Sequence, residues 1–227
     1  MAAFFGVIIG GILTIIITIV VERLRSPRVR LAIGDCITLQ PRGPLAHNWH
    51  SLRVAVSNEP LPSWADWWLL RLPALQCRAE ILFLRLDGTL FISDPMVGRW
   101  TGGSPEPQVV HIQQPNGTIP VLTNPEELKN TVDIYPGETE QLDVAVRIET
   151  ENQAYGWNNE TYFYPNWRNS KRELNHERYL VKVTVNSSGR KCTGFFNINN
   201  DGPFTSFTLT KLTPEQQQQQ MKRGSSA

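Results

Sequence analysis

Residues that could carry out chemistry are few in this sequence, and their spacing does not match known catalytic or metal sites. His47 and His50 are three residues apart and could share one face as metal ligands. A structural zinc site needs about four ligands, however, and the spacing suggests no third one. The motifs Gly-x-Ser-x-Gly, His-Glu-x-x-His and Gly-x-Gly-x-x-Gly are absent. We therefore expect no enzyme activity, no metal site and no bound cofactor.

Two further sets of reactive side chains have simpler structural interpretations. Asp133, Glu138 and Asp143 surround a predicted turn, and we interpret them as a solvated surface. The chain also contains three widely separated cysteines, Cys36, Cys77 and Cys192. An odd number of cysteines in a chain of this size predicts free thiols, and these fit a reducing compartment. On or beside apolar strands, cysteine behaves as a small hydrophobic residue.

An aromatic and amide-rich segment between residues 155 and 167 could bind sugars. Its candidate binding residues are Tyr155, Trp157, Asn158, Asn159 and Trp167. Exposed aromatic rings on a loop can stack on sugar faces, while amides bond to the hydroxyl groups. The alternative is a long loop that is packed down by its own aromatic side chains.

Residues 63–71 form the most unusual segment of the chain. Ser63 and Asp66 are spaced as in a capping box, which predicts a short helix ended by Pro73. On such a helix one face would carry Trp64, Trp67, Trp68 and Arg71. Because tryptophan prefers membrane interfaces, this face could rest on the bilayer or bind a partner. The alternative is a helix that closes one end of a β-sandwich, the fold predicted below for the rest of the chain, with its tryptophans in the core.

The chain begins with an apolar run over residues 2–21, which contains 20 uncharged residues. A helix of that length spans about 30 Å, the thickness of a bilayer core. We expect residues 1–23 to form one transmembrane helix, with the lipid bilayer as its partner through residues 2–21. A cleaved signal peptide is disfavoured because no basic residue precedes the run.

Basic residues follow the apolar run, and they predict its orientation. The flank carries Arg23, Arg25, Arg28 and Arg30. The positive-inside rule then places the following domain in the cytoplasm, although many single-span β-sandwich proteins face outward. We therefore expect a single-pass membrane protein with a cytoplasmic domain.

One face of the predicted helix carries small residues at every fourth position, namely Gly6, Gly10, Thr14 and Thr18. Stripes of this kind allow two membrane helices to approach closely. The sequence therefore allows a homodimer that forms through this stripe.

The rest of the chain has the patterning of an all-β domain. Sixteen glycines and 16 prolines indicate many turns, and a net charge of +1 argues against nucleic-acid binding. Apolar and polar residues alternate over short runs at residues 29–33, 52–57, 77–87, 89–92, 132–135, 142–148, 179–185, 192–198 and 204–212. We expect an antiparallel β-sandwich over residues 24–212 and a disordered tail over 213–227.

Several motifs resemble known domains. Residues 134–138 (Ile-Tyr-Pro-Gly-Glu), followed by residues 142–146, resemble the strand–turn–strand unit of bacterial immunoglobulin-like and fibronectin-III-like domains. Leu174, followed by Tyr179 and its strand, resembles the tyrosine corner of these folds. Residues 77–79, 95–100 and 155–160 are similar to a group of uncharacterised, membrane-anchored prokaryotic proteins. The resemblance implies an immunoglobulin-like sandwich and implies no activity.

Three functions remain open at this point, and one of them is a hydrolase whose site the sequence motifs do not reveal. The first is a membrane-anchored, non-enzymatic protein-interaction module that presents loops or a sheet edge to another protein. The alternative is a carbohydrate-binding module that faces outside the cell and uses the aromatic loop.

Overall fold

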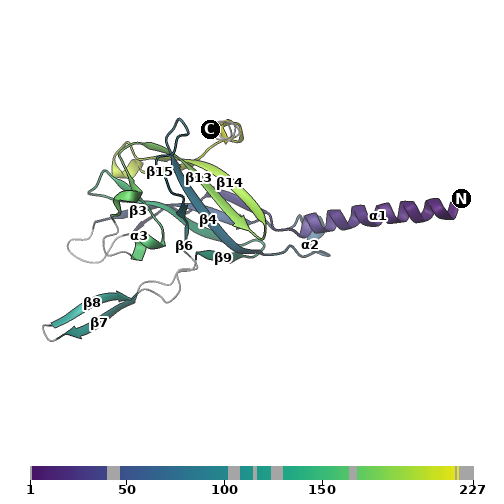
Figure 1. Cartoon of the computed structure of the whole chain (residues 1–227), viewed down its shortest axis with the longest axis horizontal. Coiled ribbons are helices and arrows are strands. Elements are labelled where there is room, and N and C mark those ends of the chain that lie inside the picture. The colour runs from purple at the N-terminus through teal and green to yellow at the C-terminus, as the bar shows by residue number, and fades with distance from the viewer. Residues whose placement is uncertain are drawn as a thin grey trace.

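Long strands with alternating side chains build two antiparallel sheets, from which a helix and a hairpin project (Figure 1). This computed structural model describes residues 2–39, 47–101, 108–114, 117–123, 130–163, 168–217 and 219. Most of the predicted tail lies outside the described residues. The chain is an all-β protein of mostly antiparallel sheets, as the sequence predicts.

The first sheet is centred on two ten-residue strands, β3 (Trp49–Asn58) and β10 (Thr139–Ile148), which pair along their whole length. Its other strands are β1 (Val29–Ile33), β2 (Ile37–Leu39), β6 (Arg99–Trp100), β11 (Ala154–Gly156) and β12 (Glu173–Leu174). The strand order is β1-β3-β10-β11-β12, with β2 beside β3 and β6 beside β10.

The second sheet is centred on β13 (Arg178–Ser187), which pairs with β4 (Ala74–Leu84) on one side and β14 (Arg190–Asn199) on the other. Its edges are formed by β5 (Met96–Val97), β9 (Thr131–Ile134) and β15 (Thr208–Lys211), which follows a 3₁₀ turn, η2 (Phe204–Ser206). The strand order is β15-β14-β13-β4-β5, with β9 beside β4.

The core lies between the two sheets, where one set of alternating side chains from each sheet is buried. It includes Leu52 and Val54 from β3, Ile81 from β4, and Val181 and Val183 from β13. The period of two in the sequence therefore identified the core faces of the long strands, because successive side chains of a strand point to opposite sides.

Two turns have the geometry that their residues predict. Ser188 and Gly189 both have positive φ and join β13 to β14 in register, as a two-residue hairpin requires. Gly137 also has positive φ, and its N–H donates to the carbonyl of Asn58. Both turns lie at the end of the sheets that is nearest to the N-terminal helix.

The predicted return strand over residues 89–92 is reduced to one bridge between Leu84 and Leu90. Asp87 accepts bonds from the N–H and the hydroxyl of Thr89, which closes the turn tightly. Phe91 then stacks on Tyr179, with ring centroids 4.7 Å apart, and Ile92 enters the core. Packing of these two side chains draws the segment away from the sheet edge.

A hairpin of β7 (Gln108–Gln114) and β8 (Gly117–Thr123) stands apart from both sheets, and the sequence patterning did not predict it. In Figure 1 it projects from the end of the sheets opposite to the N-terminal helix. The short helices α2 (Ser63–Asp66) and α3 (Asn159–Phe163) and the 3₁₀ turn η1 (Ser170–Arg172) lie in loops.

The helix α1 (Ala2–Arg25) extends outward from the sheets and makes the molecule elongated (Figure 1). Its side chains are described from residue 9 onward, and its aliphatic residues from Ile9 to Val20 are exposed. Within the described residues, no helix combines the length and the apolar character needed to cross a membrane.

Candidate functional site

The base of α1 is joined to the sheets through one buried side chain, Asn58 at the end of β3. Its Oδ1 accepts from the N–H of Arg28 at 3.0 Å, and its Nδ2 donates to the carbonyls of Leu72 and Ile134 at 3.1 Å. One fully buried amide therefore connects the linker after α1, the segment before β4 and strand β9. Buried polar groups need such partners, so this junction is fixed by hydrogen bonding.

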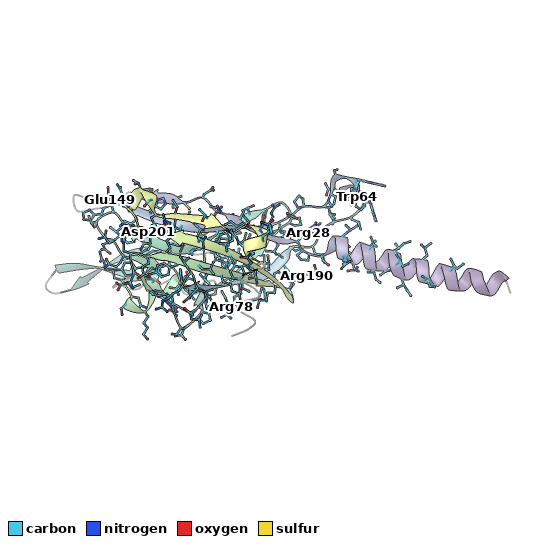
Figure 2. The ribbon with its side chains drawn as sticks, turned by 90° about the horizontal axis from the view of Figure 1, so that it is seen from above. Arg28, Trp64, Arg78, Glu149, Arg190 and Asp201 are labelled. Atoms are coloured by element: carbon cyan, nitrogen blue, oxygen red, sulfur yellow. The ribbon has the colours of Figure 1, made fainter. Side chains whose placement is uncertain are left out.

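Residues 63–72, which we call the tryptophan loop, are bonded directly to the end of α1. The N–H of Leu72 donates to the carbonyl of Arg25 at 2.7 Å, and Nη1 of Arg71 donates to the carbonyl of Ser26 at 3.3 Å. The loop consequently lies beside the helix and beyond the end of the sheets, as the position of Trp64 shows (Figure 2).

The tryptophans of this loop are exposed, so the interpretation that they fill the core is wrong. Trp64, Trp67 and Trp68 are 60%, 83% and 46% exposed, and Leu70 is 80% exposed. Only Ala65 of helix α2 is buried. Four large apolar side chains therefore project from one loop at the base of α1.

The predicted helical face is not formed as expected. Helix α2 ends at Asp66, and its first turn follows Pro62 without a bond from the side chain of Ser63, so the capping-box prediction is wrong. Arg71 lies beyond the helix, is only 8% exposed and points to the α1 linker. The bond between Leu72 and Arg25 holds the chain out of helical geometry at this point.

Four arginines surround a pocket of 380 Å³ at the same junction, which we call the arginine pocket. They are Arg23, Arg28, Arg71 and Arg190. Arg190 is the first residue of β14, far away in sequence, and nothing in the local sequence marks it as a site residue. Arg28 and Arg190 lie at the helix end of the sheets in Figure 2.

The positive charge of the junction is only partly neutralised by acids. Glu59 lies 3.9 Å from Nε of Arg28 and 3.0 Å from Nη1 of Arg30, and Glu22 lies 3.8 Å from Arg25. Within the described part of the chain, neither Arg23 nor Arg190 forms an ion pair. Of the four predicted flank arginines, Arg23 and Arg28 line the pocket, whereas Arg25 and Arg30 pair with acids outside it.

Arg71 has the least favourable environment of the four arginines. Burial lowers the pKa of its guanidinium, and the nearby charge of Arg28 lowers it further, against an opposing effect of Glu59. Its Nε atom is buried and has no acceptor among the described residues. Its charge has no ion-pair partner among the described residues, so an anion in the pocket would stabilise this side chain.

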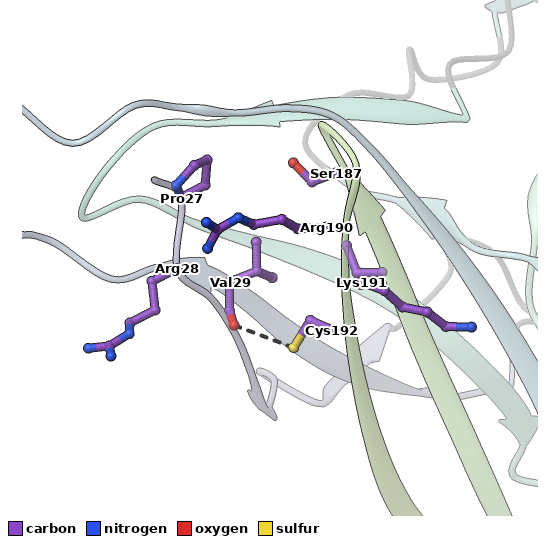
Figure 3. Close-up of a pocket in the computed structure, with 8 residues that line it drawn as sticks. Pro27, Arg28, Val29, Ser187, Arg190, Lys191 and Cys192 are labelled. Carbon is purple, nitrogen blue, oxygen red and sulfur yellow. Dashed lines mark hydrogen bonds between the residues drawn. The ribbon is translucent and has the colours of Figure 1, made fainter. Parts of the chain in front are cut away.

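A second hollow shares Pro27, Arg28 and Arg190 with the arginine pocket (Figure 3). It is smaller, at 210 Å³, and its wall includes Val29, Val185 and Cys192. The thiol of Cys192 donates to the carbonyl of Val29 at 3.4 Å, and burial raises its pKa. Arg190 and Lys191 both line this hollow, and their side chains extend in opposite directions.

The predicted sugar-binding loop is packed into the protein where it is described. Tyr155, Trp157, Asn158 and Asn159 are all buried, and Trp157 stacks edge-on against Trp49 at 5.9 Å. Trp167 lies outside the described residues. Neither Tyr155 nor Trp157 therefore offers an exposed ring on which a sugar could stack.

The acidic residues around the turn at Gly137 are not all solvated, and the prediction is wrong for Asp143. This carboxylate is fully buried and pairs with Arg53 at 2.8 Å and with Arg99. Asp133 accepts from the N–H of Gln76 at 2.7 Å. Asp143 holds together three strands of the first sheet, β3, β6 and β10, and has no free oxygen aimed at a cavity.

The histidines and the helix stripe show no arrangement for ligand binding in the described residues. No group of three or more His, Cys, Asp or Glu side chains there could hold a metal ion. His50 packs against Phe207, and burial lowers its pKa. In α1 the hydroxyls of Thr14 and Thr18 donate to the carbonyls of Gly10 and Thr14 within the helix.

No protein-family model, curated protein or solved structure matches this chain. The site is therefore interpreted from its own geometry. It combines exposed tryptophans, an arginine pocket and the base of a long apolar helix, all within one end of the molecule.

Proposed function

We propose that the chain is a single-pass membrane-anchored β-sandwich that works as a non-enzymatic protein-interaction module on the cytoplasmic side. Residues 2–21 would cross the bilayer, and the sheets would carry the interaction surface away from it. The observation that carries this proposal is the difference between the two ends of the molecule. An apolar helix with its basic and tryptophan-rich base lies at one end. At the other end lies the β7–β8 hairpin, which pairs with no other described strand (Figure 1).

The anchor is supported by the exposure of α1. Its aliphatic residues, such as Ile12, Ile15 and Ile19, are more than half exposed, and the helix continues to Ala2 without a charge before Glu22. Exposed apolar surface of this extent is costly in water. A bilayer would cover this apolar surface on all sides of the helix, and the helix satisfies its own backbone hydrogen bonds there.

The side of the membrane is supported by the arginines at the base of α1. Arg71 and Arg190 add to the basic flank, although they are distant in sequence from α1. A basic cluster immediately after a membrane helix favours retention in the cytoplasm. It also attracts the anionic lipids of the cytoplasmic leaflet.

The strand order supports an immunoglobulin-like arrangement. The first sheet has β1, β3 and β10 as consecutive neighbours, and the second has β4, β13 and β14. These correspond to the A-B-E and C-F-G groups of that fold. The hydroxyl of Tyr179, at the start of β13, donates to the carbonyl of Asn175 at 3.3 Å, as in a tyrosine corner.

The β7–β8 hairpin supports the role in protein binding. Among the described residues, its strands pair only with each other. An isolated two-stranded hairpin is marginally stable in water, and both of its edges can accept another strand. We therefore expect a partner protein to bind along the hairpin by adding a strand to it.

Photo-crosslinking in intact membranes tests this function. A photoreactive residue at Ile112 in β7 should give a discrete protein adduct, whereas the same residue at the exposed Thr210 in β15 should not. Adducts with chaperones alone, or equal adducts at both positions, would contradict the proposal. A reporter fused after residue 227 tests the side, and an externally placed reporter would exclude the cytoplasmic assignment.

A further inference from the structure

We propose that the arginine pocket binds the phosphate group of an anionic phospholipid. The proposal rests on the proposed membrane anchor for the source of the phosphate. The case for an anion in the pocket comes from the lining side chains and does not depend on the anchor.

The pocket has an excess of positive charge and a suitable size. Guanidinium groups from three separate segments line its 380 Å³, and none of its described lining residues is acidic. Arg28 is the one lining arginine that forms an ion pair among the described residues. Its partner Glu59 also pairs with Arg30. Like charges around one pocket destabilise one another, and an anion between them would offset this repulsion.

Arg71 gives a second and independent indication of a ligand. It is 8% exposed, it lines the pocket, and its buried Nε lacks an acceptor among the described residues. Its other assigned bond goes from Nη1 to the carbonyl of Ser26. Arg71 has no ion pair among the described residues, so an oxygen anion in the pocket would supply the counter-charge that its guanidinium lacks.

Phosphate fits these donors well. A phosphodiester spreads one negative charge over oxygens that can accept from several directions, and a guanidinium presents its N–H groups in a planar fork that matches them. The negative end of the α1 dipole does not oppose this binding strongly. The carbonyls of Arg25 and Ser26 already accept from Leu72 and Arg71.

The surroundings favour a lipid over a soluble phosphate. Trp64, Trp67 and Leu70 are exposed on the tryptophan loop, which is bonded to the same helix end that lines the pocket. Such side chains partition to the boundary between headgroups and acyl chains. A phospholipid would place its phosphate among the arginines and its chains beside the tryptophans and α1.

Native mass spectrometry of the full chain in detergent tests the proposal. The probes are dioctanoyl phosphatidylglycerol, dioctanoyl phosphatidylcholine and inorganic phosphate. We expect the phosphatidylglycerol to bind preferentially. Loss of a charge-assisted hydrogen bond should weaken this binding about tenfold in both Arg71→Gln and Arg190→Gln.

Lys191→Gln is the matched control, because it removes the same charge from the neighbouring residue, which points away from Arg190. It should leave the phosphatidylglycerol preference unchanged. Arg190 is an exposed residue at the start of β14, so Arg190→Gln keeps the test decisive if Arg71→Gln fails to fold. Equal retention of phosphatidylglycerol by the wild type and by the folded variants would overturn the pocket assignment.

Two further outcomes separate the possible sources of failure. Inorganic phosphate that binds as tightly as phosphatidylglycerol would overturn the lipid assignment. Alkaline carbonate extraction of the chain from membranes would overturn the anchor, whereas the dioctanoyl lipids, which need no bilayer, would still decide whether the pocket is an anion site.

Discussion

One buried carboxylate, that of Asp143, stabilises the first sheet through two arginines. Asp143 lies between Arg53 and Arg99, and the hydroxyl of Ser51 donates to it at 3.4 Å. The side chain of Asp143 is 1% exposed, and those of the two arginines are 16% and 8% exposed. Removal of the acid would therefore leave two positive charges with little contact with water.

Asp143→Asn should lower the free energy of unfolding by about 3–5 kcal/mol, because Arg53 and Arg99 lose the buried carboxylate that they share. Asp201→Asn is the control, since Asp201 pairs with Arg178 on the surface. Exposed pairs of this kind contribute about 0–1 kcal/mol. Denaturant unfolding of the full chain in detergent measures both, and equal losses would contradict a structural role for Asp143.

The buried hydroxyl of Tyr179 makes the stability of the fold depend on pH. Burial, helped by the charge of Glu177, raises the pKa of its hydroxyl to about 12. Since an unfolded tyrosine has a pKa of about 10, the native state keeps this proton longer. The stability linked to Tyr179 is thus present below pH 10 and is lost as pH rises from about 10 to about 12.

Tyr179→Phe should be less stable than the wild type near neutral pH by about 0.5–1.5 kcal/mol, because the bond to Asn175 is lost. The difference should shrink as the pH rises through the range given above, since the variant has no proton to lose there. Unfolding at several pH values measures this, with Tyr135→Phe on an exposed ring as the control. A constant difference would contradict the assignment.

Among the elements, the tryptophan loop and α1 depend on each other for position. The loop has only one helical turn of its own, and its exposed tryptophans contribute little to the core. Its position comes from Asn58 and from the bonds of Leu72 and Arg71 to the end of α1. We expect the loop to loosen whenever this junction is weakened.

Asn58→Ala removes one acceptor and two donated bonds from a fully buried position. Each buried group left without a partner costs about 1–3 kcal/mol. The variant should therefore be destabilised, and limited proteolysis should cleave it within residues 63–72 faster than the wild type. Asn169→Ala, which removes a cap from the turn η1, should not accelerate cleavage there.

At the scale of the whole molecule, the two ends have different properties. The end near α1 is basic and carries exposed tryptophans, and the opposite end carries the β7–β8 hairpin (Figures 1 and 2). The sheets between these ends have a closely packed core. Gly98 illustrates this packing, because a Cβ at this position would lie 2.5 Å from Cδ1 of Leu142 and 2.9 Å from Cβ of Ala79.

The intact fold should protect two of the three thiols. Cys36 is exposed, whereas Cys77 is buried and Cys192 is half-buried, and burial raises the pKa of both protected thiols. Because the thiolate is the reactive form, a maleimide near neutral pH should label only Cys36 quickly in the folded chain. Mass spectrometry counts the labels. Rapid labelling of folded Cys36→Ser would contradict this packing, and unfolding should expose the remaining thiols.

Local properties could be predicted from the sequence. The alternation of side chains identified the long strands β3, β4, β10, β13 and β14, because the period of a strand is set by its own backbone. The turn at Ser188 and Gly189 was also predicted, because positive φ favours glycine and a few polar residues. The apolar run that forms α1 and the basic residues after it are likewise properties of a short stretch of chain.

Only the tertiary structure brought distant residues together. It placed Arg190 beside Arg23 and Arg71, buried Asp143 between two arginines, and exposed the tryptophans that could have filled the core. These outcomes depend on which strands pair and where their ends meet. The sequence by itself determined the long strands, the turn between β13 and β14 and the apolar helix, whereas long-range pairing of strands decided which side chains share a pocket.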